Sequence, residues 1–228
     1  MLNYTYNRLC EISIINVKKD GVLMKIALFV SFFKSPQLIL YRDNMPKYKV
    51  DINYILKPEE VVRMIEVAER ERDKALISVL WLTGARPSEV IGLLRKDIKI
   101  EDMKIRITIE TKKLKKGTFI PHKRELVFSY NPANPDPIKT TLIRYVEKIA
   151  NPDFPLFEIN DSRVRQLIYE ISQKALGFRI TPYSFRHSRL TYLAKKGLTP
   201  IELMYFKGSA DTRSVSKYLH AKPFVVEE

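Results

Sequence analysis

Apolar residues recur every three or four positions through most of the chain after residue 57, which predicts a series of amphipathic helices. Several of these helices have a clear start, because proline or an acidic residue occupies the first turn. The expected starts are Pro58, about Asp73, Pro87, Thr181-Pro182 and Thr199-Pro200. Glycine is expected to end three of the helices, since it adopts the left-handed conformation of a C-cap without strain. These glycines are Gly84, Gly197 and Gly208.

Three further helices are expected from apolar spacing alone. The first has an apolar face made of Ile138, Leu142, Val146 and Ile149. The second, capped by Asp161 or Ser162, has one made of Val164, Leu167, Ile168 and Ile171. The last is short, is capped by Asp211 and carries Val215, Tyr218 and Leu219.

The spacing changes to strict alternation between Lys104 and Glu110, where three isoleucines alternate with polar residues and predict a half-buried strand. Residues 112–117 form a basic turn, and residues 118–128 are expected to return as a second strand. The fold predicted from these patterns is mainly α with a small antiparallel β-sheet.

Residues 1–50 differ from the rest, because they are rich in β-branched and aromatic residues and show little helical periodicity. We expect a short N-terminal extension or truncated arm at 1–50 and one folded domain at 51–228. The apolar segment from Val22 to Phe33 is too short to span a bilayer, so we expect no membrane association and interpret the segment as a strand or a helix.

Lys and Arg outnumber Asp and Glu by 40 to 26, and the net charge of +14 points to an anionic partner, either nucleic acid or a membrane surface. The single cysteine, Cys10, excludes an internal disulfide and fits a cytoplasmic setting. Three widely separated histidines make no zinc pattern, so no metal and no cofactor are expected.

Two arginines and a tyrosine stand at positions where they can hold and attack a phosphodiester. Arg86 lies between a helix end and a helix start, Arg186 lies in a first turn, and Tyr218 lies on the last helix. Arginine fits two phosphate oxygens at once, and tyrosine can act as a covalent nucleophile. Taken singly, each has a plain structural alternative: Arg86 could pair with Glu89, Arg186 could be a surface arginine, and Tyr218 could be a core residue.

Lys113 has the strand parity of Ile107 and Ile109, so its side chain is expected to point to the same face and to protonate a leaving oxygen. Its basic neighbours are expected to contact phosphates, although a solvated basic hairpin would look the same. These neighbours are Lys112, Lys115 and Lys116.

Three segments in this order resemble the catalytic domain of the tyrosine recombinases, the phage-integrase and Xer-like family. They are Thr83–Val90 with Leu93 and Asp97, then Thr181–Ser188, then Gly208–Tyr218. The resemblance covers about residues 57–222, and the joint spacing is specific where no single segment would be.

The resemblance implies a site-specific DNA recombinase or integrase that works through a 3′-phosphotyrosyl link without metal or ATP. Tyr218 would be the nucleophile, Arg86 and Arg186 would neutralise the phosphate, and Lys113 would protonate the 5′ oxygen. Double-stranded DNA and a homotetrameric synapse are the implied partners, and a virus or plasmid is a plausible source. Support at the site would come from His187 and Glu89, and further DNA contacts from Arg163 and Arg165.

Two positions depart from the family pattern. Tyr183 stands where a histidine is usual, a position that also varies in some archaeal virus integrases, and it is expected to act as a catalytic residue. Ser209 stands where histidine or tryptophan is usual, with Lys207 beside it as a substitute. These departures, and the short segment before the catalytic region, favour two alternatives: a catalytically weak DNA-binding remnant, or the C-terminal fragment of a split integrase. A basic RNA-binding structural protein is a third, and it predicts that Arg86 and Arg186 lie far apart.

Overall fold

The computed structural model describes residues 12–19, 22–29, 37–39, 54–112, 120–210 and 213–219. The chain divides into two compact units, residues 1–48 and 49–228. In the first unit three antiparallel strands pair in the order β1-β2-β3: β1 Ile12–Lys19, β2 Val22–Phe29 and β3 Gln37–Ile39. The apolar segment that begins at Val22 is therefore a strand as far as Phe29, and its remaining residues, 30–33, lie outside the described residues.

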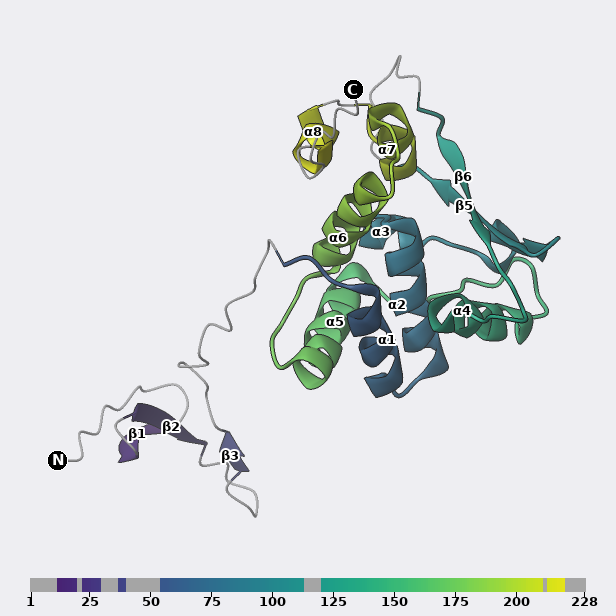
Figure 1. Ribbon diagram of the computed structural model, residues 1–228. Coiled ribbons are helices and arrows are strands. Elements are labelled where there is room, and N and C mark those ends of the chain that lie inside the picture. The colour runs from purple at the N-terminus through teal and green to yellow at the C-terminus, as the bar shows by residue number, and fades with distance from the viewer. Residues whose placement is uncertain are drawn as a thin grey trace. The chain divides into compact units, whose positions relative to one another are not determined.

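The second unit contains eight described helices and a three-stranded sheet (Figure 1). The helices are α1 Pro58–Val67, α2 Glu71–Thr83, α3 Pro87–Val90, α4 Pro137–Glu147, α5 Asp161–Leu176, α6 Pro182–Lys195, α7 Pro200–Lys207 and α8 Arg213–Leu219, with a 3-10 turn η1 at Arg95–Asp97. The antiparallel sheet has the order β4-β5-β6: β4 Ile98–Glu101, β5 Lys104–Glu110 and β6 Lys123–Ser129. The predicted fold class, mainly α with a small antiparallel sheet, is confirmed.

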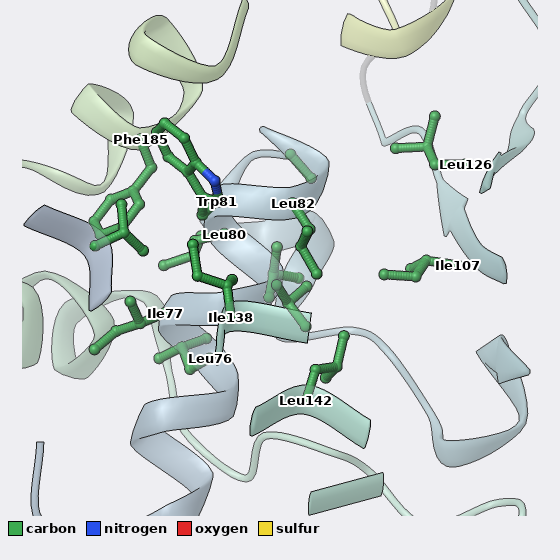
Figure 2. Packing of buried hydrophobic residues seen from close by; sticks show 14 of the residues in the cluster. Leu76, Ile77, Leu80, Trp81, Leu82, Ile107, Leu126, Ile138, Leu142 and Phe185 are labelled. Carbon is green, nitrogen blue, oxygen red and sulfur yellow. The ribbon is translucent and has the colours of Figure 1, made fainter. Parts of the chain in front are cut away.

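Helix α2 is the centre of this unit, because every residue from Ala75 to Thr83 is buried. It packs against α1, α4 and α6. Figure 2 shows its side chains between Phe185 of α6 and Ile138 and Leu142 of α4, with Ile107 and Leu126 of the sheet nearby. A helix that is apolar all round is stable only when it is covered on every side, and α2 is covered in this way.

Two glycines end helices where the prediction placed them. Gly84 ends α2 with φ 55°, and Gly208 ends α7 with φ 66°, both in the left-handed region. The cap of α5 was predicted wrongly: Asn160, not Asp161 or Ser162, is the N-cap, and its side chain accepts from the Arg163 main-chain N–H at 2.8 Å. The helix begins one residue earlier than the acidic position suggested.

The helix predicted from Pro87 is shorter than its apolar spacing suggested, since α3 ends at Val90 and Leu93 and Leu94 are not helical. Instead the Leu93 carbonyl accepts a hydrogen bond from the Leu156 main chain, and Leu94 forms a bridge with Pro155. Tertiary pairing therefore ends the helix after one turn.

The sheet contains a strand that the pattern did not predict, β4, and its second predicted strand begins at Lys123 rather than at residue 118. Asp102 and Met103 form the two-residue link from β4 to β5, both with positive φ (50° and 57°). That geometry is typical of a type I′ hairpin, which usually carries Asn-Gly or Asp-Gly. The expected signal was absent here because methionine occupies the glycine position.

Candidate active site

Arg86 is positioned by Glu89, which lies on the same short helix. The Glu89 carboxylate accepts from the Arg86 main-chain N–H at 3.0 Å and from Nη1 at 2.8 Å. Because α3 has only four residues, its dipole adds little to anion binding at this place. The ion pair with Glu89 orients the guanidinium instead.

Glu89 is itself buried, with 2% of its surface exposed, and it binds a second arginine. Arg124 of β6 donates from Nη2 to Oε2 of Glu89 at 3.1 Å. Burial alone would raise the pKa of Glu89, but the Arg124 charge, the Arg86 main-chain hydrogen bond and the charges of Arg86 and Arg186 outweigh it and lower the pKa. The carboxylate is therefore ionised at neutral pH.

Arg186 lies in the first turn of α6, as predicted, and points to the ends of two other helices. Nη1 donates to the Gly84 carbonyl at 2.8 Å, and Nη2 donates to the Lys207 carbonyl at 2.7 Å. These carbonyls belong to the C-terminal ends of α2 and α7, where the helix dipole favours a cation. Burial and the charge of Arg86 lower the pKa of Arg186 to about 10, so the group stays charged at neutral pH.

Tyr218 of α8 lies next to this cluster and is 3% exposed. Its ring is 5.3 Å from the His187 ring between centroids, and the Lys207 Nζ is 5.8 Å from its centroid. Burial raises the pKa of Tyr218, with the Arg186 charge acting in the opposite direction. The phenol is therefore neutral in this conformation and needs a base to become a nucleophile.

Helix α8 is held to the end of α7 by polar contacts. Lys207 Nζ donates to the Ser214 carbonyl at 2.5 Å, and the hydroxyls of Ser209 and Ser214 lie 3.2 Å apart. Both predicted support residues of this segment, Lys207 and Ser209, thus contact the helix that carries Tyr218.

The cluster brings three guanidinium groups and one carboxylate together, which leaves an excess of positive charge in a largely buried site. Exposure separates the three arginines: the side chain of Arg86 is 18% exposed and that of Arg124 is 0% exposed, while Arg186 as a residue is 6% exposed. Two arginines that converge on one place can hold an anion such as a phosphodiester, and Arg86 is the one that solvent reaches most.

The phage integrase family matches residues 55–223, which span the whole cluster. The chain belongs to the phage integrase family. The predicted resemblance is thereby confirmed.

Relatives within the family are moderately similar. A tyrosine recombinase XerA of Saccharolobus solfataricus is 25% identical over 179 residues, which are 78% of this chain and 56% of that protein. A tyrosine recombinase of Pseudothermotoga lettingae is 26% identical over 218 residues, covering 90% of this chain and 71% of that protein. The chain therefore spans little more than half of the first of these relatives.

Solved structures share the integrase fold. A XerA recombinase superposes with a TM-score of 0.57 at 22% identity, covering 78% of this chain and 62% of that one. A XerH recombinase bound to its difH substrate gives a TM-score of 0.58 at 22% identity, and the match covers 74% of this chain and 51% of that one. At this identity the likeness shows the fold alone.

The structure brings some of the predicted site residues together and leaves others apart. Arg86, Glu89 and Arg186 form the cluster, and His187, Lys207, Ser209 and Tyr218 adjoin it. The prediction that Arg86 and Arg186 lie far apart, made by the RNA-binding alternative, is wrong, since each influences the cluster around Glu89. Lys113, Lys115 and Lys116 lie outside the described residues.

Tyr183 and Arg186 lie three residues apart on α6 but have different surroundings. Tyr183 is 53% exposed, whereas Arg186 is buried between two helix ends. The three-residue spacing brings side chains close on a regular helix, but Arg186 is drawn inward by the carbonyls of Gly84 and Lys207.

Three of the predicted DNA-contacting residues are described, and the side chains of all three reach solvent. Lys112 is exposed, and a methyl group at Gly92 would lie 3.4 Å from its Nζ, which places the ammonium beside the end of α3. Arg163 and Arg165 pair with Glu170 and Asp161 on their own helix, with arginine side chains 42% and 57% exposed. Exposed pairs of this kind are weak and exchange easily for another anion.

Arg124 is the residue of the cluster that the sequence interpretation missed. The signal was present, because Arg124 has the same strand parity as Leu126 and Phe128 and so had to point inward. A charged residue at an inward strand position needs partners, and that requirement could have singled it out.

Two searches of the described residues are negative. No group of three His, Cys, Asp or Glu there could hold a metal ion, and no helix there is long and apolar enough to cross a membrane.

Proposed function

We propose that the protein cuts and rejoins DNA at specific sites through a covalent link between Tyr218 and a 3′ phosphate. The observation that carries the proposal is one cluster of contacts at the helix ends. Arg86 pairs with Glu89, and Arg186 donates to the Gly84 carbonyl two residues before Arg86 and to the Lys207 carbonyl. The Lys207 ammonium lies 5.8 Å from the centroid of the Tyr218 ring and donates to Ser214 on the same helix. This is the set of groups that a metal-free attack on a phosphodiester requires.

In the proposed cleavage step the Tyr218 oxygen bonds to phosphorus and the bond to the 5′ oxygen breaks. Arg86 and Arg186 stabilise the extra charge that builds up on the non-bridging oxygens. Lys113 gives a proton to the leaving 5′ oxygen, and the phenol proton passes to a base, for which His187 is the candidate because its ring lies 5.3 Å from that of Tyr218. The 5′ hydroxyl of a partner strand then reverses the reaction, so the bond energy is kept and neither ATP nor a metal is needed.

The proposed substrate is double-stranded DNA, since the chain carries a net charge of +14 and several relatives are recombinases solved on DNA. Lys112, Lys115, Lys116, Arg163 and Arg165 are proposed to contact phosphates on either side of the site. The same proposal includes a homotetramer on DNA and an intracellular location. It also includes the division of the chain into a short arm, residues 1–50, and a catalytic domain, residues 51–228.

A second candidate function, a DNA-binding protein with weak strand exchange, is favoured by one observation. Tyr218 is only 3% exposed, so its oxygen cannot attack DNA until α8 moves or opens. The two functions differ in one measurable product, the covalent adduct.

The test uses a duplex with a nick beside the scissile position, its site selected from a randomised library, and the whole chain in EDTA. Wild type is expected to give a covalent protein–DNA band on a denaturing gel, and Tyr218→Phe is expected to give none while still binding. Tyr205→Phe is the matched control, because Tyr205 lies on α7 and is 38% exposed. A band in Tyr218→Phe would move the nucleophile elsewhere, and tight binding without a band in wild type would support the second candidate.

A further inference from the structure

Arg124, a buried arginine of the sheet, contacts the candidate site although it is far in sequence from Arg86 and Arg186. Arg124 is fully buried on β6, at an inward position that Leu126 and Phe128 share. Arginine is almost never fully buried without partners, because removing its charge from water costs several kcal/mol. Its partners therefore explain why it is there.

The Arg124 guanidinium makes three described hydrogen bonds to three separate elements. Nη2 donates to Glu89 at 3.1 Å, Nη1 donates to the Thr111 hydroxyl at 2.5 Å, and Nε donates to the Phe206 carbonyl at 3.3 Å. These acceptors belong to α3, to the residue that follows β5 and to the C-terminal turn of α7. One planar group thus fixes three segments relative to one another.

The glycine that ends α7 leaves room for this guanidinium. A Cβ built on Gly208 would lie 2.6 Å from the Arg124 Nη1 and 2.8 Å from its Cζ, a separation that real Cβ atoms do not show. The close approach brings Arg124 against the backbone between Lys207 and Ser209, the segment that leads to α8.

The Arg124 guanidinium is linked to both proposed phosphate-binding arginines: through Glu89 to Arg86, and through the C-terminal end of α7 to Arg186. On one side Glu89, which accepts from Arg124, also accepts from Arg86. On the other side Phe206 accepts from Arg124, and the next carbonyl, that of Lys207, accepts from Arg186. Lys207 in turn contacts Ser214 on the helix of Tyr218.

We infer that Arg124 is a positioning residue for strand cleavage: it sets the spacing between Arg86, Arg186 and the helix that carries Tyr218, without touching DNA. The inference rests on the proposed function. It differs from a plain core role, which would require only volume and neutral packing at this position. Arg124 instead needs its charge, to keep Glu89 ionised and oriented, and its planar shape, to reach three acceptors at once.

The experiment compares Arg124→Met, Arg124→Lys and Thr111→Val with wild type in single-turnover cleavage of the nicked duplex at saturating DNA. Arg124→Met should slow cleavage at least tenfold while DNA affinity changes less than threefold, since the phosphate contacts remain. Lysine should recover part of the rate, because it can still pair with Glu89 but cannot also reach Thr111 and Phe206. Thr111→Val, which keeps the arginine, should slow cleavage only a few-fold.

Arg106→Met is the matched control, since Arg106 lies on the adjacent strand with its side chain 33% exposed and pairs only with Glu125 among the described residues. Circular dichroism and thermal unfolding identify any variant that fails to fold, and ethylguanidinium added to Arg124→Ala should raise its rate. Folded Arg124→Met that cleaves at the wild-type rate would overturn the inference, as would a loss that Arg106→Met reproduces.

A second measurement separates this inference from the proposed function. The Arg86 and Arg186 Nε–H resonances of the DNA-free protein should shift in Arg124→Lys and stay in place in Arg106→Met. Absence of any covalent band in wild type would sink the proposed function, whereas unmoved resonances in folded Arg124→Lys would sink the positioning role.

Discussion

Helix α6 carries two arginines one turn apart, Arg186 and Arg189, and the two have very different surroundings. Burial lowers the pKa of each to about 10. Judged by that shift alone, the two would be equally good candidates for a functional site.

Arg186 lies among polar and charged groups. It donates to the carbonyls of Gly84 and Lys207, and the charges of Arg86 and Arg124 lower its pKa further. Like charges held this close are costly in the free protein, and the cost falls when an anion binds between them. This arrangement favours the binding of an anion, as the proposed function requires.

Arg189 lies among aromatic rings. Its Cζ is 5.3 Å from the Tyr192 ring centroid, 5.6 Å from that of Trp81 and 5.9 Å from that of Phe128, and Nε donates to the Leu82 carbonyl at 3.2 Å. Cation–π contacts of this kind stabilise a half-buried guanidinium without any need for an anion. The comparison teaches that the neighbours of a buried charge, rather than the size of its pKa shift, indicate chemistry.

The largest expected effect comes from Arg186→Met. Removing a group that stabilises transition-state charge lowers catalytic rates by about 10²–10³-fold, and we expect a loss of about 10³-fold in cleavage at saturating DNA. DNA affinity should fall only a few-fold, because many phosphate contacts remain. The measurement is the rate of covalent adduct formation, and a loss of less than tenfold in a folded variant would remove Arg186 from the chemistry.

The next effect concerns the carboxylate that the arginines share. Glu89→Gln removes a buried charge that pairs with Arg86 and Arg124, and we expect a loss of about 2–3 kcal/mol in unfolding free energy at pH 7. Since the folded-state pKa of Glu89 is lowered from 4.5, its stabilisation is complete above that value and is lost as the pH falls through the lower folded-state pKa.

The gap between wild type and Glu89→Gln should therefore shrink as the pH is lowered from 7 through 4.5 and below. Urea unfolding followed by circular dichroism at a series of pH values measures it. A gap that stays constant down to the acid limit would mean that folding does not lower the pKa of Glu89, and a gap that widens as the pH falls would mean that folding raises it.

Whether a residue of this site could be predicted from the sequence depends on whether its role shows in a local pattern. Arg86, Arg186 and Tyr218 were predictable because helix ends and the order of three segments are local features. Arg124 carried only a parity signal, and its partners Glu89, Thr111 and Phe206 come from 35, 13 and 82 residues away. No local pattern predicts which distant groups satisfy a buried charge.

In the fold, too, elements with a local sequence pattern were predicted and elements set by pairing with other segments were not. Central helix α2 followed from its apolar run and Gly84, whereas the short length of α3 depended on the pairing of Leu93 with Leu156. Strand β4 was missed because its turn, Asp102-Met103, has positive φ without glycine, a conformation that closes the pairing of β4 with β5 against local preference.

Gly84 lies between the two arginines and allows a smaller test of the comparison. Its carbonyl accepts from Arg186, and a Cβ there would lie 3.4 Å from the Arg189 Cβ. Gly84→Ala should lose about 1–2 kcal/mol because alanine is strained at φ 55°. Gly177→Ala is the matched control, since Gly177 also has positive φ but no atom within 4 Å of the added methyl group.

Both glycine variants should lose similar stability in urea unfolding, and only Gly84→Ala should also slow cleavage. Equal cleavage rates in the two variants would show that the Gly84 carbonyl tolerates displacement, and that Arg186 does not depend on it for its position.

Arg189→Met should have the smallest effect, and it completes the comparison with Arg186→Met. Replacing a buried charge by an apolar side chain of similar volume is often neutral, and methionine also packs well against aromatic rings, so we expect a change within about 1 kcal/mol in unfolding free energy. Cleavage at saturating DNA should stay within about threefold of wild type, since Arg189 contacts none of the groups around Glu89 that the structure describes. If Arg189→Met instead cleaved as slowly as Arg186→Met, the aromatic surroundings would no longer distinguish a structural arginine from a functional one.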